Sequence, residues 1–554
     1  MLALAIVAVA VALPLRDLFR HQGPPMEEGF MLVFPERVMR GAIPNQDFLH
    51  LYGPGSLWAL AAWFKVAGVS LAAERFYGLV QHIGIILGVF FLARPWGRRA
   101  ATAAAVIAAL ITLTAIGLTA LAWNGAVALG LLSLNLGLRA RRRAGHRSDA
   151  DSVRRLRRGL LVAGVVGGLA LTFRPDLAVA VAAAMAVVAW GWGESPRRVK
   201  PVVAGLGVGL SPYLVHLATA GVGNSISGMV IDPVFKLRAG RSLPRPPSWS
   251  HYDGALQKVA DLIPPPWAFP SLRGPHQVFL WFFLLPIVAV AVAVVGWRKV
   301  RRHPDSVQAR TLLASGVFCV GMLPQAFQRP DTTHLAWVSC VTLALLPVLF
   351  AEVLGARGRA WHPSLVSLVP PIAAFAVLFV VIPFFSFRPY VDLSRRLVKP
   401  SPTGYAVSRG GRNFYLGSEP ITPAADALIK DLSARSHAGQ RLLVGPVDLR
   451  KTIYSDAYFY YLFPELVPGT YYIEMDPSMA NRPDSGLDQE VAKSDWLILS
   501  NVWNNWEEEN TSRDFGSNKP NEVVRRHFCQ IRSYGHYLDK GQDKPYFELW
   551  QRCR

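Results

Sequence analysis

The sequence contains little charge for its length. Of its 554 residues, 17% are charged and 52% are hydrophobic, whereas about a quarter of an ordinary soluble chain is charged. Acidic residues are the scarcer kind, with 37 Asp and Glu against 58 Lys and Arg and a formal net charge of +21. These proportions exclude a disordered chain, a nucleic-acid module and a single compact soluble domain. The positions of the basic residues then decide what the positive excess means.

Several motifs are absent, and cysteine is rare. The sequence has no G-x-G-x-x-G motif and no P-loop, so nothing in it indicates a nucleotide site. It also lacks the internal repeat typical of inverted-topology transporters. Of its 4 cysteines, Cys319 and Cys340 lie in apolar segments, and Cys529 and Cys553 lie near the C-terminus. The last two would form a disulfide in an oxidising compartment or remain two free thiols, and the sequence leaves both open.

Long apolar segments predict a membrane domain. Residues 278–297 and 364–387 contain no charged residue, and each segment can cross a hydrocarbon core of about 30 Å. The other candidate spans are 2–15, 76–93, 101–120, 123–138, 159–173, 177–193, 202–219, 311–327 and 335–351. The predicted fold class is an all-α polytopic membrane domain of about eleven transmembrane helices, followed by a small soluble α/β domain.

Arginine and lysine indicate the orientation of these spans. Segment 139–158 is rich in arginine and contains only Asp149 and Asp151 as acids, which is typical of a cytoplasmic connection. Alternation then places 16–75, the turns near 175 and 330, the loop 220–277 and everything after Arg388 on the external side. Segment 2–15 has no basic residue before it, so a cleaved signal peptide is an alternative to a retained span. Residues 16–75 are external in either case.

The C-terminal part differs in composition from the rest. Residues 1–387 form the predicted membrane domain, and residues 388–554 have ordinary charge and frequent turn residues. An apolar periodic segment at 424–432 predicts a helix, and 441–444 and 495–499 predict strands. We therefore expect an extracytoplasmic α/β domain there.

The first external loop holds the strongest candidate for chemistry. Glu27 and Glu28 follow the first apolar segment and precede an amphipathic stretch at 30–40. Adjacent carboxylates repel, and desolvation raises the pKa of one beside an apolar surface, so that it can act as a general base on a hydroxyl. The structural alternative is that both are solvated or stabilise the start of a helix.

The rest of this loop carries a resemblance to a known family. Residues 41–48 read Gly-Ala-Ile-Pro-Asn-Gln-Asp-Phe, and Tyr52 is followed by a Gly-Pro-Gly turn. Together with the acidic pair, this pattern resembles the membrane glycosyltransferases of the type C fold. That family uses lipid-phosphate sugars and includes protein mannosyltransferases, arabinosyltransferases and aminoarabinose transferases. The span layout and the exported C-terminal domain fit the same family.

The resemblance implies roles for individual residues. In the family, one member of the acidic pair is the catalytic base, and the other supports it or helps to bind a metal. By position these are Glu27 and Glu28, although two glutamates depart from the commoner Asp-Glu or Asp-Asp pattern and leave open which is the base. Asp47 falls at a position that the family more often uses to hold the loop, and it is a weaker candidate for substrate binding. No cofactor is certain, and a divalent metal remains an alternative.

Basic residues on the predicted external side could bind a lipid phosphate. The tripeptide Arg-Pro-Asp occurs at 174–176 and at 329–331. A structural explanation suffices for both: Arg meets the last carbonyls of one helix, Pro ends it, and Asp caps the next. Arg174, Arg329 and His334 are nevertheless candidates, because arginine binds phosphate in bidentate fashion and remains charged near apolar surfaces.

The external loop 220–277 contains a second basic run. Lys236 and Arg238 are its candidate substrate-binding residues, and Arg241 and Arg245 follow them. An anionic head group or a sugar phosphate would compensate this charge. The alternative is a solvated loop with a Pro-rich interfacial segment at 264–267.

We therefore expect an integral membrane glycosyltransferase. It would pass a sugar from a polyprenyl-phosphate donor to a hydroxyl of a glycan, lipid or protein acceptor, with inversion and a Glu base. Nucleic acid is not an expected partner. The alternatives are a transporter or flippase of a lipid-linked saccharide, against which the absence of mid-span charges counts, and a non-catalytic envelope scaffold.

Overall fold

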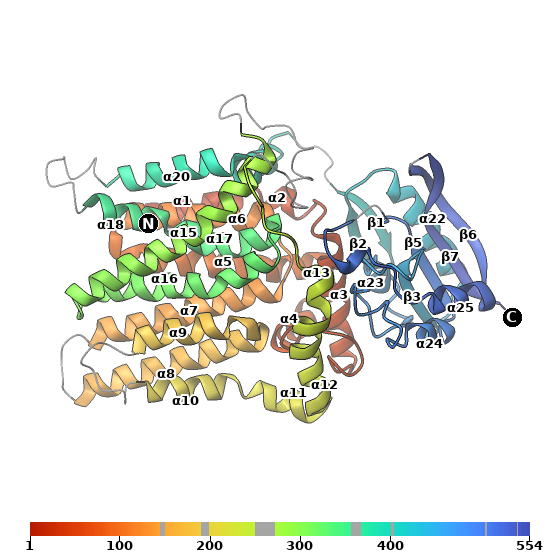
Figure 1. The fold of residues 1–554 in the computed structure, drawn as a ribbon, viewed down its shortest axis with the longest axis horizontal. Coiled ribbons are helices and arrows are strands. Elements are labelled where there is room, and N and C mark those ends of the chain that lie inside the picture. The colour runs from red at the N-terminus through yellow and green to blue at the C-terminus, as the bar shows by residue number, and fades with distance from the viewer. Residues whose placement is uncertain are drawn as a thin grey trace. The chain divides into compact units, whose positions relative to one another are not determined.

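The computed structural model describes residues 1–144, 150–189, 199–249, 272–355, 367–399, 404–504, 507–539 and 541–553 (Figure 1). The chain divides into two compact units, and each contains several separate segments. Unit 1 comprises Met1–Arg16, Gly78–Val215 and Pro244–Pro400, and unit 2 comprises Asp17–Tyr77, His216–Leu243 and Ser401–Arg554.

Unit 1 is helical throughout its described residues. Two of its helices, α5 (Leu71–Ala93) and α11 (Pro212–Ala220), begin or end in unit 2. The remaining long helices are α1 (Leu2–Ala12), α6 (Arg98–Ala115), α7 (Ala122–Ala144), α8 (Ala150–Phe173), α9 (Ala178–Ala189), α10 (Lys200–Gly209), α15 (Gly274–Arg302), α16 (Val307–Gln328), α17 (Thr332–Thr342), α18 (Leu346–Gly355), α20 (Val369–Val381) and α21 (Arg388–Arg395).

Seven helical segments of the described residues are long and apolar enough to cross a membrane. They coincide with predicted spans, and a bent pair formed by α20 and the helix after it would make an eighth. The other predicted spans fall on α1, α7 and α9. Helices α1 and α9 are short, with 11 and 12 residues, whereas α7 has 23 residues but carries Asn124, Asn135 and terminal arginines. The chain is thus a polytopic membrane protein with a mostly helical membrane part. Residues 190–193 of one predicted span lie outside the described residues.

The predicted span 364–387 is not one straight helix. Helix α20 ends at Val381, Ile382 leaves the helical region with φ −132° and ψ 44°, and a new helical segment begins at Pro383. The two parts are bent by 99°. Proline has no N–H to donate, and its ring clashes with the preceding turn, which explains the break. Residues 364–366 lie outside the described part of the chain.

Unit 2 contains short helices from two parts of the chain. The first loop forms α2 (Leu15–Leu18), α3 (Pro25–Met39) and α4 (Gly55–Ala67). Residues 222–241, expected as loop, are helical as α12 (Val222–Ile226), the π-helix η4 (Ser227–Leu237) and α13 (Arg238–Arg241). Their apolar residues alternate with Gly, Pro and charge, which conceals the helical period. The Pro-rich segment 264–267 lies outside the described residues.

The C-terminal part of unit 2 is the expected α/β domain. Strands β1 (Tyr405–Arg409) and β2 (Arg412–Leu416) form a hairpin. A five-stranded sheet has the order β4-β3-β5-β7-β6, with β3 parallel to β4 and β5, and β7 antiparallel to β5 and β6. Its strands are β3 (Arg441–Pro446), β4 (Val467–Pro468), β5 (Trp496–Ser500), β6 (Phe528–Asp539) and β7 (Gln542–Arg552). The helices are α22 (Ile421–Arg435), α23 (Tyr458–Leu462), α24 (Leu487–Ala492) and α25 (Lys519–His527).

The predicted helix and strands of this domain are confirmed as α22, β3 and β5. All five residues of β5 are buried, because a central strand is covered on both faces and therefore reads as a continuous apolar run. Cys529 and Cys553 form a disulfide that closes the end of the β6–β7 ladder. The sequence alone had left this pairing undecided.

Candidate functional site

The acidic pair lies in the first turn of α3. Pro24 is extended and Pro25 occupies the first helical position, where its fixed φ favours the helix and its missing N–H costs nothing. Glu27 and Glu28 therefore stand at a helix N-terminus, where the helix dipole stabilises negative charge. Successive helical residues point in different directions, and the two glutamates have different surroundings: Glu28 is fully buried, whereas Glu27 is half-buried.

Glu28 forms a bidentate ion pair with Arg75. Nε of Arg75 lies 2.6 Å from Oε1 of Glu28, and Nη2 lies 2.8 Å from Oε2. Arg75 also donates to the carbonyls of Leu18 at 3.0 Å and His21 at 2.8 Å. Gly23 leaves room for this carboxylate, since a Cβ there would lie 2.7 Å from Oε2. Both charged side chains are 1% exposed, so the pair fixes the start of α3 to the preceding segment.

Glu27 belongs to a different group of charges. Glu474 and Asp476, from the loop before α24, are buried, and Arg241 of α13 pairs with both. Arg241 contacts Asp476 directly and lies 3.6 Å from Glu474. Burial raises the pKa of Glu474 well above its ordinary value, and the carboxylates of Asp476 and Glu27 raise this pKa further. Arg241 opposes this rise, and the like charges near Glu474 favour uptake of a proton by its carboxylate.

Close backbone approach brings α3 to the C-terminal segment of unit 2. A Cβ at Gly29 would lie 3.0 Å from the backbone nitrogen of Tyr458. The loop that carries Glu474 is fixed by Ser455, whose hydroxyl donates to the carbonyl of Ile473 at 2.6 Å. Within unit 2, the first loop, residues 216–243 and the C-terminal domain therefore all contribute to the surroundings of Glu27.

Asp47 stabilises its own loop. Its Oδ2 accepts a hydrogen bond from the backbone N–H of Ile43 at 2.7 Å, and its carbonyl accepts one from Arg37 at 3.2 Å. The neighbouring Asn45 adopts a left-handed φ of 66° and donates to the carbonyl of His50 at 2.5 Å. The Asp47 side chain is exposed, and its bonds are those of a residue that shapes the loop.

The basic run of 236–241 is partly compensated by acids of the protein itself. Lys236 lies 2.8 Å from Asp232, four residues earlier in η4. Arg241 is held by Asp476 and Glu474. Arg238 is exposed and is the member of this run that remains best placed to meet a ligand from solution.

The two Arg-Pro-Asp turns lie in unit 1. In each of them the arginine forms an ion pair with the aspartate of the same turn. Arg174 forms a bidentate pair with Asp176 at 2.9 and 2.6 Å, and its side chain is 5% exposed. Its guanidinium lies 5.0 Å from the ring of Trp123. No side-chain cap is formed at this turn, so Asp176 positions Arg174 instead of capping a helix as expected.

Asp331 behaves as the sequence predicted. It caps α17 by accepting the N–H of His334 at 2.8 Å, and it also pairs with Arg329 and with Nδ1 of His334, each at 2.7 Å. Burial alone would raise the pKa of Asp331, but His334 and Arg329 outweigh it and hold this pKa well below its ordinary value. The carboxylate that caps α17 therefore also binds Arg329 and His334, the two candidates for phosphate contact.

Aromatic rings connect the two turns. Trp123, next to Arg174, stacks on Trp337 with centroids 5.7 Å apart, and Trp337 lies 4.4 Å from the ring of His334. Arg174 also donates to Gln325 of α16 at 3.3 Å. Arg174, Arg329 and His334 thus belong to one region of unit 1, although 155 residues of sequence separate the two arginines.

Of the predicted site residues, the structure places Glu27, Glu28, Asp47, Lys236 and Arg238 in unit 2, and Arg174, Arg329 and His334 in unit 1. Sequence reasoning did not identify Arg75, Glu474 or Asp476 as site residues. It noted Arg241 only as part of a basic run. Arg75 carried a weak signal, since it is a charged residue at the start of an apolar helix. The others are separated from Glu27 by hundreds of residues and show no spacing that would relate them to it.

The described residues do not fit a divalent metal. Among them, no group of three or more His, Cys, Asp and Glu side chains could hold a metal ion. Both oxygens of Glu28 are bound to Arg75, and Asp476 is bound to Arg241. These carboxylates already have a cationic partner, so we derive no catalytic step from a metal.

No protein-family model matches this chain, and no curated protein matches it. Among solved structures, it is similar to the archaeal oligosaccharyltransferase AglB from Archaeoglobus fulgidus, solved with an inhibitory peptide and a dolichol-phosphate. The identity is 11% and the TM-score 0.48, over 98% of this chain and 74% of that one. ArnT from Cupriavidus metallidurans, bound to undecaprenyl phosphate, matches with 13% identity and a TM-score of 0.48, over 99% of this chain and 97% of that one. Apo ArnT matches with 14% identity and a TM-score of 0.49 over the same shares. The similarity to these two proteins extends over nearly the whole length of this chain. It is a similarity of backbone fold and not of sequence.

Proposed function

We propose that this protein is an integral membrane glycosyltransferase that transfers a sugar from a polyprenyl-phosphate donor to an acceptor hydroxyl, with Glu27 as the general base. The observation that carries the proposal is the different environment of the two adjacent glutamates. Glu28 is buried and bound through both oxygens to Arg75, so its charge is already compensated by an arginine and its carboxylate is closed to solvent. Glu27 is half-buried and lies among other carboxylates. The donor class follows from the resemblance of the first loop to type C glycosyltransferases.

The proposed reaction is a single displacement. The Glu27 carboxylate takes the proton of the acceptor hydroxyl while that oxygen attacks the anomeric carbon. The bond between this carbon and the phosphate oxygen breaks, and the lipid phosphate leaves with the electron pair, which inverts the anomeric centre. Glu27 interacts electrostatically with the buried Glu474 of the same unit. Positioned general bases contribute about 10²–10⁴-fold in rate.

Stabilising the leaving phosphate requires cations. The side chains of Arg329 and His334 are 11% and 18% exposed, and each of them is paired with Asp331. Arg174 is nearly buried and held by Asp176. Within unit 1, Arg329 and His334 are the first candidates for binding a lipid phosphate, and Arg174 is the next. Within unit 2, which holds Glu27, Arg238 and Lys236 are the candidates for contact with an anionic part of the donor or acceptor. Such contacts act where charge develops on the leaving group.

We propose that the reaction takes place on the external face of the cell membrane. The positive-inside pattern puts the first loop and the C-terminal domain there, and the disulfide between Cys529 and Cys553 supports an oxidising compartment. The acceptor hydroxyl would belong to a glycan, a lipid or a protein.

The decisive experiment replaces the two glutamates separately in the full chain. Glu27→Gln removes the proposed base and should lower kcat of sugar transfer from a polyprenyl-phosphate donor by about 10²-fold or more, with an unchanged melting temperature. Glu28→Gln should lower the melting temperature, because it leaves Arg75 buried without its counter-charge. Asp47→Asn serves as a control for an exposed acid of the same loop. Full transfer activity in Glu27→Gln would exclude the mechanism.

A further inference from the structure

Helices α8 and α10 contact each other through their backbones. Gly164 and Gly168 of α8 face Gly205 and Gly209 of α10. A Cβ at Gly164 would lie 2.4 Å from the carbonyl oxygen of Val202, and one at Gly205 would lie 2.2 Å from that of Leu161. Small residues permit this approach between membrane helices. The helices run side by side (Figure 1), and the contact fixes their separation near Leu161 and Val202.

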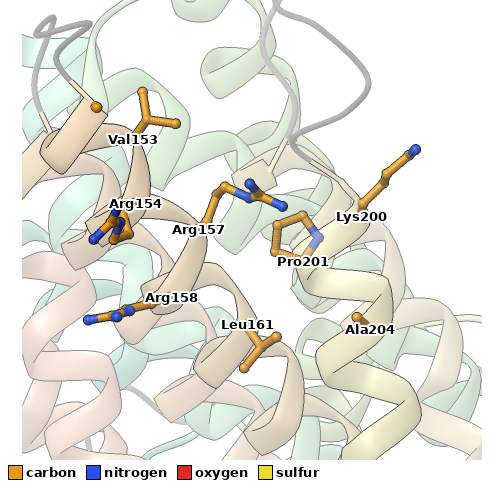
Figure 2. Close-up of a pocket in the computed structure, with 9 residues that line it drawn as sticks. Val153, Arg154, Arg157, Arg158, Leu161, Lys200, Pro201 and Ala204 are labelled. Atoms are coloured by element: carbon orange, nitrogen blue, oxygen red, sulfur yellow. The ribbon is translucent and has the colours of Figure 1, made fainter.

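A cavity opens where this close contact ends. It lies between the first half of α8 and the first turns of α10, with a volume of about 500 Å³. Figure 2 shows Arg157 reaching from α8 toward Pro201 at the start of α10, with Lys200 beyond it and Leu161 below. The lining residues are Ala150, Val153, Arg154, Arg157, Arg158, Leu161, Lys200, Pro201 and Ala204.

The cavity combines four cations with an apolar wall. Arg154, Arg157 and Arg158 follow the i, i+3, i+4 spacing that places side chains on neighbouring positions of a helix surface. These arginines and Lys200 are all exposed, and none of them forms an ion pair with a residue that the structure describes. Among the residues that the structure describes, no acidic one lines the cavity. Four like charges line this cavity and favour an anion there. In Figure 2 the guanidinium of Arg157 points toward α10, whereas those of Arg154 and Arg158 point to the other side and Lys200 extends outward.

The position of the cavity identifies the kind of anion. Helices α8 and α10 both belong to segments long and apolar enough to cross a membrane, and in the segment from Lys200 only 22% of the apolar window is buried within the protein. Val203 and Val208 of α10 are each 59% exposed, which is expected of a face turned to lipid. The cations begin both helices, at the level of lipid head groups, and Leu161 and Ala204 extend the wall toward the apolar interior.

We propose that this cavity is a binding site for an anionic phospholipid, with its phosphate at Arg157, attracted also by the other three cations of the lining, and an acyl chain against the apolar wall. Arginine suits this role because its planar guanidinium binds phosphate in bidentate fashion and remains charged near apolar surfaces. Basic pockets between membrane helices are general sites for anionic head groups. The positive-inside pattern assigns the site to the cytoplasmic leaflet. It is therefore separate from the proposed transfer site and does not depend on the proposed reaction.

The test titrates the purified full chain in detergent with phosphatidylglycerol, phosphatidylcholine or inorganic phosphate and counts bound lipid by native mass spectrometry. The wild type should retain one phosphatidylglycerol at least about tenfold more tightly than phosphatidylcholine. The triple variant R154Q/R157Q/R158Q should lose this preference. The matched variant R298Q/R301Q/R302Q removes three charges from the end of α15, where the arginines are also exposed, and should retain it.

The outcomes separate specific binding from general attraction. Equal loss of phosphatidylglycerol in both triple variants would overturn the proposal, because net charge alone would then explain binding. Displacement of the lipid by excess inorganic phosphate would also overturn it, in favour of a site for a soluble anion. If R154Q/R157Q/R158Q fails to fold, Ala204→Trp decides: it fills the apolar wall without changing charge and should lower phosphatidylglycerol retention at least about tenfold, and unchanged retention would contradict the proposal.

Discussion

The start of α3 and the α8–α10 pair are held together in opposite ways. At α3, buried charges determine the geometry: Arg75 binds Glu28 and two carbonyls. Between α8 and α10, four glycines bring backbone against backbone without any charge. Lipid tails are as apolar as the helices, so membrane helices associate through close packing, whereas a buried ion pair fixes orientation at a cost in desolvation. Loss of a charge should therefore lower stability at the start of α3, and gain of a methyl group should lower it between α8 and α10.

The largest effect is expected from Arg75→Met. This change leaves Glu28 buried without its counter-ion, and such losses cost about 3–5 kcal/mol of stability. We expect a much lower melting temperature, measured by thermal unfolding in detergent. The double variant Arg75→Met with Glu28→Gln removes both charges and should recover part of the loss. A single variant as stable as wild type would mean that the pair does not hold the start of α3.

Asp456 is a buried carboxylate that sharpens the comparison, because no cation of the described residues lowers its pKa. Removing its charge should raise stability, whereas removing the charge of Arg75 should lower it. Burial raises the pKa of Asp456 to about 6, against hydrogen bonds from Ser500 and Trp503 that lower it. Asp456 therefore binds its proton more tightly in the native state than in the unfolded state. Proton binding at Asp456 contributes to stability below about pH 4, and this contribution is lost as pH rises to about 6.

Asp456→Asn removes this penalty. Since a pKa difference of one unit corresponds to about 1.4 kcal/mol, the variant should be more stable than wild type by up to about 3 kcal/mol above pH 7 and nearly equal to it at pH 4. Melting temperatures of both proteins across this range provide the measurement. A stability difference that does not change with pH would contradict the assignment.

The smallest effect is expected from a single methyl group between α8 and α10. A Cβ at Gly209 would lie 2.1 Å from the carbonyl oxygen of Val165, so Gly209→Ala forces the helices apart and should cost about 1–3 kcal/mol. Gly207 is the matched control on the same helix, because nothing lies within 4 Å of a Cβ there. Gly207→Ala should leave thermal stability unchanged or slightly higher. Equal melting temperatures for the two variants would argue against the backbone contact.

Local patterns in the sequence predicted much of the fold. Apolar length predicted the membrane helices, and the short apolar runs at 441–444 and 495–499 predicted β3 and β5. The bend at Ile382 was not predicted, because hydropathy measures composition and does not register the break that Pro383 causes. Helices α12 to α13 were missed for a related reason, since glycine, proline and charge interrupt their apolar period.

The site was less accessible to sequence reasoning than the fold. The first loop could be singled out because its acidic pair and its motif are contiguous. The partners could not be found in this way: Glu28 and Arg75 are 47 residues apart, and Arg241 and Asp476 are 235 residues apart. Such pairs depend on tertiary contacts, and no local period relates their positions. The distinction between the two glutamates therefore emerges only in three dimensions.

The strand order of the C-terminal domain has a consequence for biosynthesis. Strand β7 is made after β6, yet it lies inside the sheet between β5 and β6, and Cys553, one residue after it, closes the disulfide. Until β7 has been synthesised, β6 lacks its partner in the sheet and β5 has an open edge, which favours pairing with other chains. The five-stranded sheet can therefore be completed only after β7 has left the ribosome, and a nascent chain stopped before β7 would keep this edge exposed.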